Sequence, residues 1–437
     1  MNSLGIKTNR APDYGDNTGI GNTSTAVEHD NGKRSYSINY LKTASSNLRV
    51  LTGARVTKIN FSQPDDDGRR TALSIDLIHR SVPYTIMARR EVILSAGTYN
   101  SPQVLERSGI GNPRVLEPLG IEPIIPNVGV GENLQDHLYV PTDYVVNKGV
   151  FTLGTSSDNV RALELTLIPS MLSDKLRIDK EYTDEQAELY ESSGKGAFTA
   201  TISACGFLPL DRVVPKNELV QLKEDLDKEL KATEGQLEQT DLQKAQYKIQ
   251  RDFLERDDVG HVEILLHPKV FVSKPEDNTS YVALIAGIMH PFSRGSVHIS
   301  SKDAFSTPII DSGYLNSAFD AKCLAKTLTF LRKLADTEPL KSITKPSTPS
   351  ADIQTEEQWD RYARNNARTL QHPIGTVAMA PKQLGGVVDS NLLVYGTTNL
   401  RVADMSVAPL HISCHTAHTA YAIGEKAHEL ISRGGDF

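Results

Sequence analysis

The sequence has little cysteine and no excess of positive charge. Its 437 residues include three cysteines, Cys205, Cys323 and Cys414, which lie far apart and form no Cys-x-x-Cys pair. Such an odd, sparse set argues against a disulfide framework and against a zinc site built on paired cysteines. Lys and Arg number 47 against 54 Asp and Glu, so the formal net charge is −7. We therefore expect no nucleic-acid partner.

Long apolar runs are also missing. No stretch approaches the roughly 18 apolar residues that a membrane span requires. The N-terminal segment MNSLGIKTNRAPDYGDNTGIGN has no apolar core of the signal-peptide kind. As it stands, the sequence predicts no membrane partner and a cytoplasmic location. Its content of 39% hydrophobic and 23% charged residues excludes collagen, coiled coil and global disorder.

Three motifs of well-known chemistry are absent. No Gly-x-Ser-x-Gly segment supports serine hydrolysis. His415 and His418 are spaced as His-x-x-His, but the glutamate of a His-Glu-x-x-His zinc motif is missing, so we expect no metal. The loop GVGENL at 129–134 pairs two glycines but has Leu134 in place of the third glycine of a dinucleotide-binding turn.

Hydrophobic patterning indicates a mixed α/β chain. Period-three-to-four spacing predicts helices at 318–335 and 355–367, and a charged helical hairpin, solvated on one side, over 213–258. A further helix follows residue 416 and continues toward the C-terminus. Alternating or short apolar runs predict strands at 48–51, 55–59, 73–79, 84–88, 91–95, 262–266, 281–288, 296–300 and 400–403.

Two histidines stand at positions where the local chain restricts them. His372 precedes Pro373, which pushes it toward extended geometry, and a rigid loop suits a catalytic base. His415 comes just before the C-terminal helix, where unpaired N–H groups and the helix dipole favour a neutral imidazole and attract a developing anion. A structural role remains open for either residue. Gly97, after the strand at 91–95, is either a tight structural turn or a point of close approach to a ligand.

Together, these segments resemble the glucose–methanol–choline (GMC) family of flavin oxidoreductases. The resemblance runs from about residue 14 to 432, with 213–258 as a variable insertion. It is carried, in order, by GTYNSPQVLERSGIG at 97–111, GVGENLQDH at 129–137, HPFSRGSVHISSKD at 290–303, PIIDSGYL at 308–315, QHPIGT at 371–376 and GGVVDSNLLVYGTTNLRVADMSVAP at 385–409.

The resemblance implies an α/β plus α+β architecture. A partial Rossmann-like FAD-binding lobe would be assembled from 1–145 and 371–437, and an antiparallel-sheet substrate lobe from 146–370. The family begins with a strand, a Gly-x-Gly-x-x-Gly turn and a helix that hold the ADP part of FAD. This sequence contains no such element, so we expect its FAD-binding lobe to be N-terminally incomplete.

The resemblance also implies a reaction and its residues. Family members move a hydride from an alcohol carbon to flavin N5 while a base takes the hydroxyl proton. His372 matches the base and His415 the second residue that hydrogen-bonds the substrate oxygen, although the two roles could be reversed. The positions that match contacts to FAD are Val56, Ala96, Gly97, Asp404, Met405, Thr416 and Ala417.

The expected function is FAD-dependent oxidation of a small-molecule alcohol to an aldehyde or ketone. Two alternatives stay open: a truncated, non-catalytic relative that cannot retain FAD, and a lyase that keeps flavin on the same scaffold. Neither the alcohol, nor the choice between oxidase and dehydrogenase, nor the oligomeric state follows from the sequence.

Overall fold

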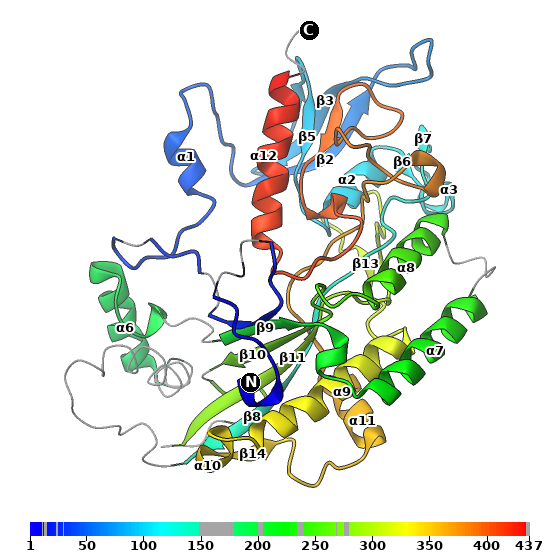
Figure 1. Ribbon diagram of the computed structural model, residues 1–437. Coiled ribbons are helices and arrows are strands. Elements are labelled where there is room, and N and C mark those ends of the chain that lie inside the picture. The colour runs from blue at the N-terminus through cyan, green and yellow to red at the C-terminus, as the bar shows by residue number, and fades with distance from the viewer. Residues whose placement is uncertain are drawn as a thin grey trace.

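The computed structural model describes the chain except residues 11, 13–14, 23–24, 29, 148–175, 177–178, 200–203, 234–239, 268, 275–278 and 434–437. Figure 1 shows a large sheet in the lower half of the molecule and a smaller group of strands beside helix α12 in the upper half. We call these the sheet lobe and the α12 lobe.

The sheet lobe is built on a seven-stranded antiparallel sheet. The central strand β11 pairs with β8 along its whole length, from Ser280↔Val146 to Ile288↔Leu138, and with β10 from Ala283↔His267 to Ile288↔Val262. The strands, in spatial order, are β1 (Gly19–Gly21), β9 (Ala204–Leu208), β10 (Val262–His267), β11 (Ser280–Ile288), β8 (Leu138–Val146) and β14 (Thr344–Thr348), with β15 (Arg368–Thr369) also paired to β8.

Two helices cover this sheet in Figure 1. Helix α9 (Ala318–Ala335) buries 12 of its 18 residues, including Leu324 and Leu328, against the strands. Helix α11 (Glu356–Asn366) begins with a capping box in which Thr355 and Gln358 satisfy each other's backbone N–H groups. The helices expected at 318–335 and 355–367 are therefore confirmed.

The charged segment 213–258 contains two helices, as expected. Helix α7 (Lys216–Thr233) buries Leu219, Leu222 and Leu226 in the main hydrophobic core, and α8 (Asp241–Phe253) follows it. Lys326 of α9 pairs with Glu218 of α7 at 2.6 Å. The insertion thus packs its apolar face on the sheet lobe and leaves its charged face in solvent.

The α12 lobe combines a three-stranded antiparallel meander with a parallel pair. The meander consists of β2 (Ala54–Phe61), β3 (Ala72–His79) and β4 (Val82–Met87). The parallel pair joins β5 (Val92–Leu94) to β16 (Leu400–Val402), which lie some 300 residues apart in the chain. Helices α2 (Ser101–Arg107) and α12 (Ala417–Arg433) complete this lobe (Figure 1).

One predicted strand is wrong. Residues 48–51 form no strand and pair with no other strand in the described part of the chain. Leu48, Val50 and Leu51 are each at least half exposed, because a strand forms only where a partner strand takes up its backbone hydrogen bonds. The other predicted strands coincide with β2–β5, β10–β12 and β16, where β12 is Ser296–His298.

The other elements of the described chain are mostly short. They are η1 (Asn2–Leu4), α1 (Asn39–Thr43), β6 (Ile110–Gly111), α3 (Pro113–Leu116), η2 (Glu117–Leu119), β7 (Ile125–Pro126), α6 (Lys180–Ser193), η3 (Ala197–Thr199), η4 (Leu210–Arg212), β13 (Ile309–Asp311), α10 (Leu340–Ile343), η5 (Lys382–Leu384) and η6 (Met405–Val407). None of the helices within the described residues is long and apolar enough to cross a membrane.

The expected fold class, a Rossmann-like α/β lobe with an antiparallel-sheet lobe, is confirmed. The division of the chain at 145/146 and 370/371 stays a prediction. The sheet takes β1 and nearly all of β8 from the segment 1–145, because these strands pair with β9 and β11. It also takes β15 from 146–370.

Candidate functional site

The site begins where the parallel strands β5 and β16 end. Their common direction brings Ala96-Gly97 and Asp404-Met405 to the same edge. The Gly97 N–H donates to Asp404 Oδ2 at 3.0 Å, and the Ser101 hydroxyl donates to the same oxygen at 2.5 Å. Four of the residues predicted to touch the cofactor are thus brought together.

Gly97 provides room beside this edge. Its φ of +80° is a conformation that side-chain-bearing residues rarely adopt, and no atom lies within 4 Å of the point where a Cβ would stand. A ligand can therefore approach the backbone closely at this turn. The sequence alone left two interpretations of Gly97 open, a structural turn and a contact to a ligand. The open space is consistent with a cofactor at this position.

Hydrogen bonds tie the His372 loop to the same edge. The Thr98 hydroxyl donates to the Pro373 carbonyl at 2.7 Å, and the Thr376 hydroxyl donates to the Thr98 carbonyl at 2.6 Å. The Val377 N–H donates to the Ser406 carbonyl at 2.9 Å. The turn after β5, the loop after β16 and the histidine loop therefore form one hydrogen-bonded platform.

The backbone of His372 is held by a buried carboxylate. Its N–H donates to Asp136 Oδ1 at 3.0 Å, and the Tyr314 hydroxyl donates to Asp136 Oδ2 at 2.7 Å. Burial raises the pKa of Asp136, and these hydrogen bonds oppose the rise. The loop also contains Gln371 in the left-handed region, with φ +63°. These constraints set the direction in which the His372 ring points.

A second histidine determines the tautomer of His372. His137 Nε2 lies 3.0 Å from the Met289 carbonyl, which only accepts, so this nitrogen carries a hydrogen. Burial holds the pKa of His137 well below its usual value, and the ring is neutral. Its Nδ1 is therefore an acceptor, and His372 Nδ1, 3.0 Å away, donates to it.

His372 is consequently neutral with its Nε2 lone pair free. Burial, assisted by the nearby His415, lowers the pKa of His372 to about 4. Since Nδ1 holds the hydrogen that reaches His137, Nε2 has none. A neutral imidazole with a free lone pair is the chemical form of a general base.

His415 has the opposite environment. Its ring centre lies 5.2 Å from that of His372, and its Nε2 lies 2.7 Å from Glu263 Oε1. Glu263 is fully buried in β10 and also accepts a hydrogen bond from Cys205 Sγ at 3.0 Å. The hydrogen bond with this carboxylate raises the pKa of His415, although burial opposes it. The direction of this shift is opposite to the one expected from the helix N-terminus, which favours a neutral ring, because the buried carboxylate outweighs it.

Further histidines surround the pair. The ring of His411 lies 3.8 Å from that of His137, and His290 Nε2 lies 2.9 Å from the Ser413 hydroxyl. Burial lowers the pKa of His411 well below the usual value and that of His290 to about 4. These rings are neutral, so they add bulk and polarisable surface around His137 without adding positive charge.

The remaining predicted residues lie around this platform. Thr416 is buried and Ala417 begins α12, directly after His415. Val56 is half-buried in β2 and packs into the hydrophobic core of the α12 lobe. No hydrogen bond among the described residues joins Val56 to the other predicted contacts, and the role of each of these residues stays a prediction.

Sequence reasoning missed four contributors: His137, Glu263, Cys205 and His411. His137 ends the motif GVGENLQDH, so the sequence marks its position, but it does not show that His137 contacts His372. Glu263 had a usable signal, because it is the one charged residue in the apolar run VEILL, and a buried charge needs a partner. Cys205 and His411 carried no comparable signal.

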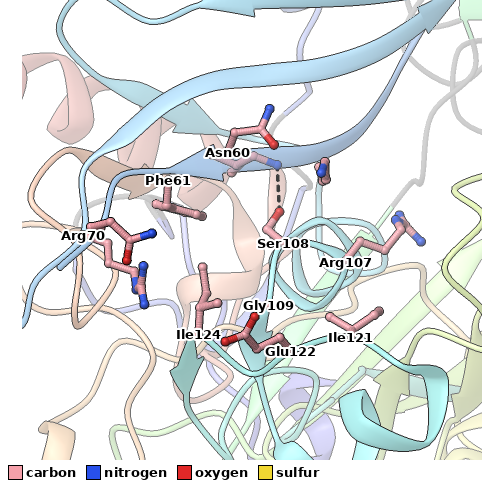
Figure 2. A pocket seen from close by; sticks show the side chains of 12 residues that line it. Asn60, Phe61, Arg70, Arg107, Ser108, Gly109, Ile121, Glu122 and Ile124 are labelled. Atoms are coloured by element: carbon pink, nitrogen blue, oxygen red, sulfur yellow. Dashed lines mark hydrogen bonds between the residues drawn. The ribbon is translucent and has the colours of Figure 1, made fainter.

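A separate pocket of about 350 Å³ lies between β2, the end of α2 and the loop 121–124. Figure 2 shows Glu122 near its centre, Arg70 on one side and Arg107 on the other, with Ser108 bonded to the Ile59 backbone. No histidine lines this pocket. Three basic residues, Lys58, Arg70 and Arg107, and one acidic residue, Glu122, line it, and it takes no part in the site described above.

Comparison with known proteins identifies the family. Profiles of the GMC oxidoreductase N- and C-terminal regions match residues 1–139 and 291–424. A dehydrogenase of Armillaria gallica is 33% identical over 99% of this chain and 65% of its own length, so the chain spans just under two thirds of that relative.

Two solved structures share the fold. An FAD-dependent oxidoreductase from Chaetomium thermophilum is 25% identical, with a TM-score of 0.83 over 99% of this chain and 70% of that chain. A fungal aryl-alcohol oxidase is 24% identical, with a TM-score of 0.82 over 99% of this chain and 69% of that chain. FAD, the expected cofactor, is thus the cofactor of this group of proteins. The chain belongs to the GMC oxidoreductase family.

Proposed function

We propose that this chain carries the catalytic residues of an FAD-dependent oxidoreductase that converts a CH–OH group of a small alcohol to an aldehyde or ketone. The observation that carries the proposal is the pair of imidazoles, 5.2 Å apart, with opposite protonation preferences. Alcohol oxidation needs both forms at once, because one group must take the hydroxyl proton while another stabilises the negative charge left on oxygen.

FAD, when bound, supplies the acceptor for the hydride that leaves the alcohol carbon. The residues proposed to hold it are those that share the platform at the ends of β5 and β16, together with the start of α12 and Val56. The open space at Gly97 supports this placement. The positive end of the 17-residue helix α12 points into the same region and favours negative charge there.

His372 is proposed as the proton acceptor. Its Nε2 lone pair is free because Nδ1–H is committed to His137. Its backbone is anchored by Asp136 and its loop by Thr98, so the ring keeps one orientation without substrate. General base help of this kind contributes roughly 10²- to 10⁴-fold to a rate.

His415 is proposed as the hydrogen-bond donor to the substrate oxygen. Its Nε2 is committed to Glu263, which leaves Nδ1–H for the substrate. The carboxylate raises the pKa of the ring and so stabilises its charged form, which makes the donor stronger as negative charge develops on the oxygen. In this proposal the general base is therefore His372 and not His415.

The test is reconstitution with FAD followed by exposure to alcohols without oxygen. Protein incubated with FAD and freed of unbound cofactor should retain the yellow flavin spectrum, and aliphatic, aryl or sugar alcohols should bleach it. Protein that stays colourless after this treatment contradicts the proposal and favours the non-catalytic relative. Flavin that is retained but not bleached by any alcohol class, while an alcohol-derived substrate is cleaved, would favour the lyase.

A further inference from the structure

The strongest cluster of metal-ligating atoms in the described part of the chain lies beside the proposed catalytic pair. A sulfur of Cys205, a carboxylate oxygen of Glu263 and a ring nitrogen of His415 all lie within 4.8 Å of one another. They come from three separate elements: β9, β10 and the segment just before α12. These three ligands form no local sequence motif, because Glu263 lies 58 residues after Cys205 and His415 lies 152 residues after Glu263.

The glutamate of this cluster has unused bonding capacity. Glu263 is fully buried, and its Oε1 accepts from both Cys205 and His415. Its other oxygen, Oε2, is buried and has no hydrogen-bond partner among the described residues. A buried carboxylate oxygen without a partner is costly in free energy, and a cation held by both oxygens of Glu263 would satisfy it.

We propose that Cys205, Glu263 and His415 bind one Zn²⁺ ion, with the fourth coordination position open toward the proposed substrate. Thiolate, carboxylate and imidazole are the three side-chain ligands that zinc takes, and three protein ligands with one open position is the arrangement of accessible zinc sites. Bonds of about 2.0–2.3 Å in a tetrahedron place donor atoms roughly 3.3–3.7 Å apart. The observed separations of 2.7 and 3.0 Å require only a small outward movement of the donors.

Binding of Zn²⁺ replaces hydrogens that the cluster already holds, so the buried site need not accept the full charge of the ion. Without metal, the S–H of Cys205 and the Nε2–H of His415 are both donated to Oε1 of Glu263. On binding, these two bonds to hydrogen break, bonds to Zn²⁺ replace them, and the thiol proton goes to solvent. The imidazole proton also goes to solvent from a cationic ring, or moves to Nδ1 in a neutral one, and no electrons are transferred.

Zinc at this position would also act on catalysis, a consequence that rests on the proposed function. His415 would exchange its Nε2–H for a bond to the metal, and the metal would occupy space beside the substrate oxygen. We therefore expect Zn²⁺ to inhibit competitively with the alcohol, and a chelator to restore the rate.

The test measures binding of ZnCl₂ by titration calorimetry, without turnover. One-to-one saturable binding, with at least one proton released when buffers of different ionisation enthalpy are compared, supports the site. Cys205→Ser keeps the hydroxyl donor to Glu263 but removes the thiolate, so its affinity should fall by at least about 100-fold. Cys414→Ser is the matched control, because Cys414 is also half-buried, adjoins His415 and lies outside the ligand set; its affinity should equal that of the unaltered protein.

Cobalt provides a second readout. Co²⁺ bound through a thiolate gives a sulfur-to-metal charge-transfer band, which should be present in the unaltered chain and in Cys414→Ser and absent in Cys205→Ser. The proposal is overturned if the unaltered chain shows no saturable binding, if Cys205→Ser binds as tightly as the unaltered chain, or if both serine variants lose affinity equally. Since none of these readouts uses flavin or alcohol, failure of the proposed oxidation leaves this result intact, and the converse holds.

Discussion

The two sides of the candidate site differ in what surrounds each imidazole. On one side, His372 contacts other neutral histidines, and its nearest hydrogen-bonding ring is His137 at 3.0 Å. On the other side, His415 contacts the buried carboxylate of Glu263 at 2.7 Å. Both rings are half-buried, yet the pKa moves down in the first and up in the second.

This difference teaches that burial alone does not determine the protonation of a histidine. Desolvation disfavours the charged ring on both sides, and only the charge of the partner distinguishes them. Pairs of titratable groups whose surroundings separate their pKa values are the arrangement used for acid and base roles in one site. The following predictions test whether this contrast governs activity.

The largest expected effect comes from removing the neutral imidazole. His372→Ala should lower kcat by roughly 10²- to 10⁴-fold, because no other group in the described site offers a free imidazole lone pair at that position. Steady-state kinetics on the FAD-reconstituted protein measures it. His418→Ala is the control, since His418 is exposed on α12 three residues after His415. Equal rates in the unaltered chain and His372→Ala would remove His372 from the mechanism.

The contrast also predicts the pH dependence. The pKa of His372 is about 4, so its base form is present above that pH, and kcat/KM should decrease tenfold per pH unit as the pH falls below about 4. The pKa of His415 is raised, so its charged form persists above the ordinary histidine range, and kcat/KM should fall only at higher pH.

Glu263→Gln separates these two limbs. Without the carboxylate, the pKa of His415 should fall, and the alkaline limb of the pH profile should move to lower pH by more than the acid limb, because Glu263 makes only a minor contribution to the pKa of His372. A profile in which the acid limb moves instead would reverse the assignment of the two histidines.

A smaller effect is expected from the residue that sets the tautomer. His137→Leu removes the acceptor for His372 Nδ1–H and should reduce kcat by about 2- to 10-fold, the value of one hydrogen bond of roughly 0.5–1.5 kcal/mol. His137→Gln offers a carbonyl oxygen in its place and should recover part of the rate. A purely structural role would lower the melting temperature in both variants without the recovery of kcat in His137→Gln.

The smallest effect concerns the loop that carries His372. Thr98→Val removes the hydrogen bond to the Pro373 carbonyl and should destabilise the fold by about 1 kcal/mol. Thermal unfolding measures this loss, and the pH profile should keep both limbs, because neither imidazole changes its partner. As a matched control, Thr57→Val alters a half-buried threonine that bonds the Asp76 carbonyl within the meander, away from the histidines. A shifted acid limb in Thr98→Val alone would show that the loop also governs the ionisation of His372.

Much of the fold followed from local pattern, and the failures have a common cause. Helix α9 was predicted at its observed bounds because a helix satisfies its own backbone, so the apolar spacing of 318–335 is sufficient. The strand expected at 48–51 is absent because a strand depends on a partner that the local sequence does not specify. For the same reason, the pairing of β1 and β8 into the large sheet was not foreseen.

The sequence by itself determined the kinds of residue available: two histidines in rigid loops, a glycine turn after a buried strand, and motifs in the order of the GMC family. Only the tertiary structure decided what those histidines are chemically. The ionisation and tautomer of an imidazole depend on the groups within a few ångströms of it. For His372 the deciding group is 235 residues away in the chain, and for His415 it is 152 residues away. Contacts over such separations exist only after the chain has folded.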